Sequence, residues 1–213
     1  MIENTGKPAL GAAMRERYEE LRGEIAERLG DFSRVPHEAY FYELCYCLLT
    51  PQSKARNAAA VVETLQKRGF AEQGFDPTEL LAATEHYIRF HNVKAGRLLT
   101  ARQQTGELRS LLSGQLSPQQ ERDWLVGNVG GLGMKEASHF LRNIGRRGLA
   151  ILDRHIIKCL AACGIDVDAG RMGSRKYYEE TERRWLDFCA AEAIPIDEMD
   201  LLFWSAETGE ILK

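Results

Sequence analysis

The segment from Val129 to His155 (VGGLGMKEASHFLRNIGRRGLAILDRH) restricts the fold of this chain more than any other stretch. Three glycines follow one helical pattern, which runs from Pro118 to about Asn128, and precede a second that begins near Met134. Glycine permits positive φ and, without a Cβ, lets another backbone approach the turn. The spacing therefore predicts a helix-hairpin-helix over residues 118–145. Amides at the start of its second helix would point outward with partial positive charge and suit a phosphate group.

Helical patterns also fill the rest of the chain. Apolar residues recur every three or four positions from Met14 to Leu29 and predict an amphipathic helix, which Gly30 is expected to close. Residues 37–50 are apolar on nearly every side and predict a helix that is buried all round. Ser53 is expected to cap a further helix that ends near Arg68, and Asp197 is expected to cap the helix that contains Trp204.

Two tetrapeptides mark other helix starts. Residues 76–79 (DPTE) and 117–120 (SPQQ) each combine a cap residue, a proline at the first helical position and an acid or amide three residues after the cap. Strand-like alternation is limited to residues 149–152, a stretch too short to build a sheet. We therefore predict an all-α fold in which residues 1–213 form a single compact unit of two lobes. A central helical lobe spans 36–112, and the N- and C-terminal helices form the other lobe.

Charge is distributed unevenly along the chain. The formal net charge of -3 argues weakly against a general polyanion binder. Residues 135–158, however, contain six basic and two acidic residues, and this excess coincides with the glycine turn. Most charge runs are only solvated helix faces, but the coincidence with the turn favours phosphate binding.

Composition indicates the compartment and the use of cysteine. No apolar run approaches the roughly 20 residues of a membrane span, and residues 1–10 lack the pattern of a signal peptide. We therefore expect a cytoplasmic protein that is not associated with a membrane. Five cysteines make an odd count in such a chain and predict buried thiols. Cys159 and Cys163 share a helix face, yet no nearby His or Cys completes a ligand set, so we expect no metal site.

Lys135 and Asp153 carry the candidate chemistry. Lys135 follows the glycine turn, where apolar neighbours and helix dipoles would disfavour its ammonium form and leave an amine able to attack carbon. Asp153 stands where the next helix should begin and could stabilise positive charge on a reacting sugar. An isolated aspartate at that place is more often an ordinary N-cap, and an isolated lysine more often lies in solvent.

The chain resembles a known family at these positions. VGGLGMKEASHFLRNIG and LAILDRHI resemble the helix-hairpin-helix and Gly/Pro-Asp signature of the DNA glycosylase superfamily that includes endonuclease III. KEASHFLRN and LDRH more narrowly resemble the second family of 8-oxoguanine DNA glycosylase/AP lyases, small proteins found largely in archaea and some bacteria. LLTPQSKARNA at 48–58 resembles the segment of that family that inserts near the lesion, and FWSAETGEILK at the end resembles the segment that recognises the base.

The resemblance implies a bifunctional enzyme and assigns residues to its roles. Lys135 would attack C1′ as the base leaves, Asp153 would stabilise the oxocarbenium ion, and β-elimination would then cut the strand. Base recognition is assigned to Lys213, Trp204, Gln52 and Ser53, and contact with DNA phosphates to Gly131, Gly133, Arg154 and His155. The implied partner is double-stranded DNA containing 8-oxoguanine or abasic sites, bound by a nucleoid-associated prokaryotic monomer. No redox cofactor or catalytic metal is needed, although family analogy allows a Na+ or K+ ion at the hairpin.

Departures from related families narrow the prediction, while three alternatives stay open. Only Cys189 lies beyond Cys163, so the closely spaced C-terminal cysteines of an iron–sulfur cluster are missing, and no strands supply the sheet domain of eukaryotic-type enzymes. A related glycosylase for a different damaged base would keep Lys135 and Asp153. A non-catalytic helix-hairpin-helix DNA-binding module would need neither residue. An all-α scaffold that binds protein has only the acidic net charge in its favour.

Overall fold

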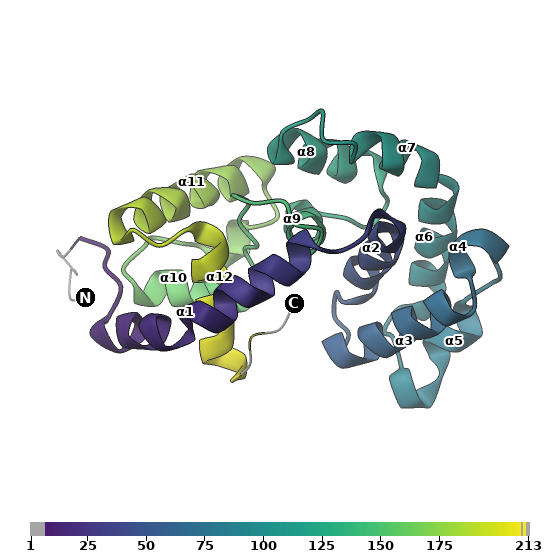
Figure 1. Cartoon of the computed structure of the whole chain (residues 1–213), viewed down its shortest axis with the longest axis horizontal. Coiled ribbons are helices and arrows are strands. Elements are labelled where there is room, and N and C mark those ends of the chain that lie inside the picture. The colour runs from purple at the N-terminus through teal and green to yellow at the C-terminus, as the bar shows by residue number, and fades with distance from the viewer. Residues whose placement is uncertain (1–6, 210, 212–213) are drawn as a thin grey trace. The chain divides into compact units, whose positions relative to one another are not determined.

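The computed structural model describes residues 7–209 and 211, and the regular elements in this part of the chain are all helices (Figure 1). The all-α prediction is therefore confirmed. The chain divides into a terminal unit, residues 1–34 and 145–213, and a central unit, residues 35–144. None of the described helices has both the length and the apolarity needed to cross a membrane.

The central unit is built around α2 (Tyr40–Leu49), which is buried along most of its length as its apolar sequence predicts. α2 packs against α3 (Ala55–Lys67), α6 (His91–Gln103) and α9 (Met134–Asn143). Burying an apolar side chain such as Leu44 contributes about 1.5–3 kcal/mol relative to leaving it exposed. The unit is completed by η1 (His37–Ala39), α4 (Phe70–Gln73), α5 (Thr78–Ala82), η2 (Thr84–His86), α7 (Thr105–Leu111) and α8 (Pro118–Asn128).

The terminal unit has α12 (Ile196–Thr208) as its central helix. α12 packs against α1 (Ala12–Ser33), α10 (Arg154–Ala162) and α11 (Arg175–Glu192). A short η3 (Ala169–Arg171) precedes α11. An aromatic pair joins two of these helices, because the buried rings of Trp185 and Phe203 stack with their centroids 6.4 Å apart.

Polar contacts reinforce the packing of α1 on α12. The hydroxyl of Tyr18 donates a hydrogen bond to Oε2 of Glu198 (2.6 Å), and Nη2 of Arg17 donates to the carbonyl of Ser205 (3.0 Å). Burial, together with the hydrogen bond to the carboxylate of Glu198, raises the pKa of Tyr18 to about 12. The N-terminal helix is thus held to the terminal unit by both apolar and polar groups.

Residues 149–152 form neither a helix nor a strand. The backbone N–H of Ala150 donates to Oε1 of Glu182 (2.7 Å), and that of Leu152 donates to the hydroxyl of Tyr178 (3.2 Å). The same hydroxyl donates to the carbonyl of Ala150 (2.7 Å). Side chains of α11 therefore satisfy the backbone groups that a neighbouring strand would otherwise satisfy, and they fix the segment that leads into α10.

Of the predicted helix boundaries, one is confirmed, one is shifted by a residue and one is wrong. Ser117 and Gln120 form the predicted capping box at the start of α8. α5 begins at Thr78, one residue later than the pattern at 76–79 predicts, and the N–H of Thr78 donates to Oδ1 of Asp76 (2.9 Å). Gly30 does not close α1, which continues to Ser33. The helix continues because Gly30 keeps a negative φ and the apolar stripe extends to the buried Phe32.

Two predicted caps are also wrong. α3 begins after Lys54 without a side-chain cap, and Oγ of Ser53 instead accepts a hydrogen bond from the N–H of Arg89 (3.0 Å). α12 begins one residue before Asp197, whose Oδ2 accepts a hydrogen bond from the N–H of Gly148 (3.0 Å). In both cases the side chain bonds to a distant backbone group rather than to the start of its own helix.

Candidate active site

The predicted helix-hairpin-helix consists of α8, a turn at residues 129–133 and α9, all in the central unit. α8 ends at Asn128, and the N–H of Val129 donates to the carbonyl of Leu125 (2.9 Å). α9 begins after Gly133, whose N–H donates to Oε2 of Glu136 (3.3 Å). The turn therefore delivers the chain into the first turn of α9, where Lys135 lies.

The glycines of this turn have different roles. Gly131 has a φ of 97°, and a Cβ at this residue would lie 2.6 Å from Cδ of Arg97 on α6. Gly133 has a φ of -91° and a ψ of -177°, which any residue adopts, and a Cβ there would lie 3.1 Å from the carboxylate of Glu136. A Cβ on Gly130 would meet no atom within 4 Å. The expected need for glycine thus applies to Gly131, for its conformation and for the close approach of Arg97.

Lys135 is the second residue of α9, and its side chain is 37% exposed. Its Nζ forms an ion pair with Oε1 of Glu136 (2.9 Å). A protonated amine that is paired with a carboxylate cannot attack carbon, so this pair must open and a proton must leave before Lys135 acts as a nucleophile. The expectation of a lysine among apolar neighbours did not include this carboxylate.

Asp153 is the N-cap of α10 in the terminal unit. Its Oδ1 accepts hydrogen bonds from the N–H groups of His155 (2.8 Å) and Ile156 (2.9 Å), so the ordinary capping role is confirmed. Within the described residues its Oδ2 makes no hydrogen bond. One carboxylate oxygen of Asp153 therefore caps α10, while the other is available for a further contact.

Arg154 and His155 lie in the first turn of α10, close to α12. Nε of Arg154 donates to Nε2 of His155 (3.1 Å), while Nδ1 of His155 lies 3.5 Å from Oε2 of Glu207. The imidazole meets the indole of Trp204 edge to face, with centroids 5.1 Å apart. Glu207 also accepts a hydrogen bond from Nζ of Lys158 (2.7 Å), which lowers the pKa of its carboxyl group. His155 is thus held at both ring nitrogens, and the exposed Arg154 is better placed to meet a phosphate.

Gln52 and Ser53 lie in the turn between α2 and α3, residues 50–54. Gln52 has a φ of 57° and an exposed side chain. A residue other than glycine in the left-handed region is uncommon, and such residues concentrate at functional positions. Ser53 is partly buried, and its Oγ accepts hydrogen bonds from the N–H of Arg89 (3.0 Å) and from Nζ of Lys94 (3.1 Å).

Some residues next to this turn were not predicted from the sequence to belong to the site. Phe90 has a φ of 60° and is 49% exposed, and the guanidinium of Arg89 stacks over its ring at 4.9 Å. Tyr87 is also exposed, and we refer to Tyr87 and Phe90, which are three residues apart just before α6, as the exposed aromatic cluster. The signal in the sequence is the run YIRF at 87–90, in which two aromatic residues flank a pair containing arginine just before a helix.

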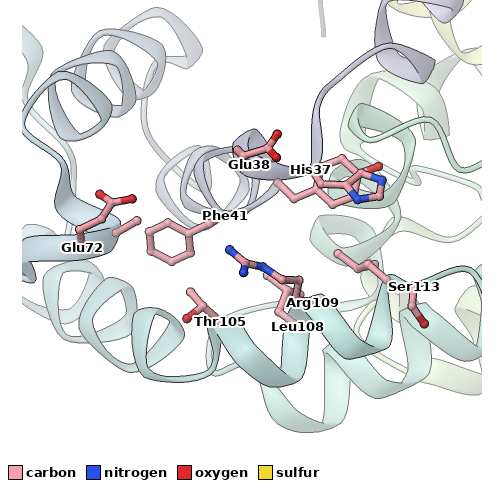
Figure 2. A pocket seen from close by; sticks show the side chains of 11 residues that line it. His37, Glu38, Phe41, Glu72, Thr105, Leu108, Arg109 and Ser113 are labelled. Atoms are coloured by element: carbon pink, nitrogen blue, oxygen red, sulfur yellow. The ribbon is translucent and has the colours of Figure 1, made fainter.

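A pocket of about 530 Å³ lies elsewhere in the central unit (Figure 2). Residues of η1, α2, α4 and α7 line it, with apolar groups such as Phe41 and Leu108 and charged groups such as Glu72 and Arg109. Figure 2 shows Phe41 and Arg109 facing the same hollow. No predicted site residue lines this pocket, so it does not mark the candidate active site.

The predicted site residues divide between the two units. The central unit carries Lys135, Gln52, Ser53, Gly131 and Gly133, and the terminal unit carries Asp153, Arg154, His155 and Trp204. Lys213 lies outside the described residues. Among the residues that are described, no group of three or more His, Cys, Asp or Glu side chains could hold a metal ion. All five cysteines are free thiols, and four of them are buried, with Cys163 partly exposed.

Comparisons with known proteins agree over nearly the whole chain. Residues 25–194 match the family described as 8-oxoguanine DNA glycosylase. Proteins named 8-oxoguanine DNA glycosylase/AP lyase from Fusobacterium nucleatum and Korarchaeum cryptofilum are both 35% identical to this chain, covering 92% and 94% of it and 94% and 95% of their own lengths.

Solved structures give the same result. The crystal structure of the 8-oxoguanine DNA glycosylase of Thermotoga maritima matches with a TM-score of 0.83 at 30% identity, covering 94% of this chain and 97% of that one. The Methanocaldococcus jannaschii 8-oxoguanine glycosylase/lyase in complex with a 15mer DNA containing 8-oxoguanine matches with a TM-score of 0.81 at 29% identity, covering 94% and 100%. The chain therefore belongs to the family of 8-oxoguanine DNA glycosylases.

Proposed function

We propose that this protein excises 8-oxoguanine from double-stranded DNA and then cuts the strand at the resulting abasic site. The observation that carries the proposal is the place of Lys135, a partly exposed amine in the first turn of α9, directly after a glycine turn. Backbone amides at such a helix start attract a phosphate. A DNA phosphate bound there would bring the neighbouring sugar to the lysine.

The reaction uses the two residues at the helix starts. Lys135, once its ion pair with Glu136 has opened and its amine is neutral, attacks C1′ of the damaged nucleotide. The bond from C1′ to the base breaks, and the base leaves with the electron pair and takes up a proton. The free Oδ2 of Asp153 stabilises the positive charge that develops on the sugar.

Strand cleavage follows from the covalent intermediate. The C1′–O4′ bond of the adduct then breaks, O4′ takes up a proton, and a Schiff base forms between Lys135 and C1′. This Schiff base acidifies the hydrogens on C2′, and loss of one of them expels the 3′ phosphate by β-elimination. Hydrolysis of the Schiff base then returns the free amine. Each of these steps needs only protein side chains, the DNA and water.

Base recognition is proposed for Gln52, Ser53, Trp204 and Lys213. Guanine and 8-oxoguanine differ at N7, which is an acceptor in the first and an N–H donor in the second. One well-placed acceptor can therefore distinguish them by about 1–3 kcal/mol. The exposed Gln52 offers such an acceptor, and Nε1 of Trp204 is a buried donor without a hydrogen-bond partner among the described residues.

DNA binding is proposed to combine phosphate contacts with an apolar contact. The amides near Gly131 and Gly133, together with Arg154, would bind phosphates, and His155 would support this contact by accepting the hydrogen bond from Nε of Arg154. The damaged nucleotide must leave the base stack, which costs a few kcal/mol. The exposed aromatic cluster offers ring faces to the bases left unstacked, which would offset part of that cost.

Borohydride trapping tests the nucleophile. Borohydride reduces a Schiff base and should link the wild-type protein covalently to DNA that contains the lesion. Lys135→Gln should abolish this product while duplex binding persists. Lys67→Gln is the matched control, because Lys67 is an exposed lysine of the same unit that also pairs with a glutamate, Glu63. Undiminished trapping of the Lys135 variant would refute the assignment.

A panel of duplexes, each with one defined lesion, tests the substrate. The proposal predicts base release from 8-oxoguanine in preference to guanine and to oxidised pyrimidines. Preference for another lesion, with trapping through Lys135 retained, would instead identify a related glycosylase for a different damaged base. Binding without any base release would identify a non-catalytic DNA-binding protein.

A further inference from the structure

Lys94 is a buried lysine with no role in the chemistry described above. Its side chain lies in the first turn of α6, and the residue is only 2% exposed. Nζ donates hydrogen bonds to the carbonyls of Leu49 (2.7 Å) and Pro51 (2.6 Å) and to Oγ of Ser53 (3.1 Å). An ammonium group has three hydrogens, so each of them has an acceptor in the turn at residues 50–54 or at the end of α2.

Burial of this charge is costly. It lowers the pKa of Lys94 to about 8, and the positive charge of Arg97, one turn further along α6, lowers it as well. The oxygens of the turn are dipoles rather than carboxylates, so they compensate the charge only in part. An apolar side chain of similar volume would fill the same space without this cost. The presence of lysine here therefore indicates that its hydrogen bonds to the turn have a role that an apolar side chain could not fill.

The turn that receives these bonds contains a strained residue. Gln52, with its φ of 57°, stands between Pro51 and Ser53, and Lys94 bonds to both of these neighbours. A strained backbone conformation persists only where its surroundings determine it from more than one side. Lys94 supplies that constraint, since it holds the chain immediately before and immediately after Gln52.

α6 is in turn fixed to the hairpin that carries the nucleophile. The side chain of Arg97 lies against Gly131, in the space that a Cβ would occupy. Nε2 of Gln104, at the end of α6, donates to the carbonyl of Asn128 at the end of α8 (3.0 Å). The turn at residues 50–54 is thus connected through α6 to the hairpin, and all of these contacts lie within the central unit.

We propose that Lys94 is a positioning residue for base excision: its three hydrogen bonds hold residues 50–54 in the conformation that presents Gln52 and Ser53 to the damaged base. This inference rests on the base-recognition role proposed for those two residues. It predicts that Lys94 matters for release of a base and not for cleavage at a site from which the base is already gone.

The chain supplies a matched control for this prediction. Arg102, also on α6, donates hydrogen bonds from Nε to the carbonyls of Phe70 (3.1 Å) and Ala71 (2.9 Å) and from Nη2 to that of Glu72 (2.6 Å). It therefore holds α4 in the way that Lys94 holds the turn, with three bonds to oxygen atoms. Lys94→Met and Arg102→Met each remove such a set, but only the first removes contacts to residues 50–54.

The experiment compares two activities of each variant. Excision of 8-oxoguanine and strand cleavage at a preformed abasic site are measured as kcat/KM, both normalised to the fraction of protein that borohydride traps on abasic DNA. Lys94→Met should lower excision about tenfold or more relative to cleavage, whereas Arg102→Met should leave the ratio of the two unchanged. Amide hydrogen exchange at Ser53 and Arg89 should become about tenfold faster in Lys94→Met alone.

The outcomes separate this inference from the function on which it rests. An unchanged ratio together with unchanged exchange at Ser53 overturns the positioning role. If Lys94→Met does not fold, the same measurements are made on Lys94→Gln, which keeps two donors without the charge and should show the same selective loss. Gln52→Ala and Ser53→Ala test the proposed function directly. If these two variants lower excision while both Lys94 variants do not, only the positioning role of Lys94 is refuted. If neither Gln52→Ala nor Ser53→Ala lowers excision, the recognition role of the turn is refuted.

Discussion

Lys135 and Asp153 both stand at the start of a helix, and the two units hold them in different ways. Lys135 is placed by its neighbours in the sequence, the glycine turn before it and Glu136 after it. Asp153 follows the irregular residues 149–152, whose backbone bonds to Tyr178 and Glu182, at sequence separations of 26 and 32 residues. One site is locally encoded, and the other depends on the packing of a distant helix.

This difference predicts different responses to substitution. Changes in α11 or α12 should disturb Asp153 while leaving the hairpin intact, since Arg97 and Glu136, which contact the turn, belong to the central unit. Changes in the glycine turn should disturb Lys135 directly. A variant in one unit that lowers both the trapping by Lys135 and the stability around Asp153 to the same extent would contradict this difference between the two residues.

The largest effect is expected for Asp153→Asn. Asparagine caps a helix as well as aspartate does, so the free energy of unfolding should fall by less than about 1 kcal/mol. Loss of the negative charge at Oδ2 should lower the rate of base excision about 100-fold or more. Single-turnover kinetics and thermal melting measure the two effects.

Asp168→Asn is the control for that variant. Asp168 also accepts a backbone N–H at a helix start, that of Gly170 (2.8 Å), in the same unit. It should change neither the rate of excision nor the melting temperature appreciably. A normal rate for Asp153→Asn with a lowered melting temperature would reduce Asp153 to a helix cap.

A smaller effect is expected for Tyr178→Phe, which tests the long-range support of Asp153. The hydroxyl of Tyr178 serves both the N–H of Leu152 and the carbonyl of Ala150, and both groups are buried. Leaving them unpaired should cost about 1–3 kcal/mol of unfolding free energy. Excision should slow as well, because the segment leading to Asp153 loses its support.

Tyr177→Phe distinguishes this effect from general destabilisation. Tyr177 is the neighbouring residue on α11, is equally well buried, and accepts a hydrogen bond from the N–H of Asp168 (2.8 Å) instead. It should lower stability without a matching loss of excision. If the two variants lose activity in proportion to their stability, residues 149–152 do not position Asp153.

Sequence patterns predicted the features that depend on neighbouring residues. The all-α fold, the capping box at Ser117 and the cap at Asp153 follow from spacings of three or four residues, and the structure confirms each of them. The buried α2 was also evident, because its apolar residues leave no polar face. Such features can be predicted without knowing which distant residues pack against the segment.

Two of the errors came from contacts between distant residues. Ser53 and Asp197 have the composition of caps, but each bonds to a backbone amide 36 or 49 residues away. The buried position of Lys94 could not be predicted either, because a lysine within the motif HNVKAGR reads as an exposed residue of an amphipathic helix. Lys94 meets its three acceptors only when α6 packs against α2.

The smallest effect concerns the glycine turn itself. Gly131→Ala forces an alanine into the left-handed region, which costs about 1–2 kcal/mol, and its Cβ must also displace Arg97. Gly130→Ala is the control, because Gly130 has no positive φ and its Cβ would meet open space, so the change should stay within about 0.5 kcal/mol. Chemical denaturation measures both variants.

Duplex binding extends this test from stability to function. Gly131→Ala should weaken binding, because moving Arg97 disturbs the packing of α6 against the turn whose amides are proposed to meet a phosphate. Gly130→Ala should bind as the wild type does. If both alanines destabilise and weaken binding equally, the turn needs its glycines as a group, for the approach of a DNA backbone, and the particular geometry of Gly131 against Arg97 is not what sets the hairpin.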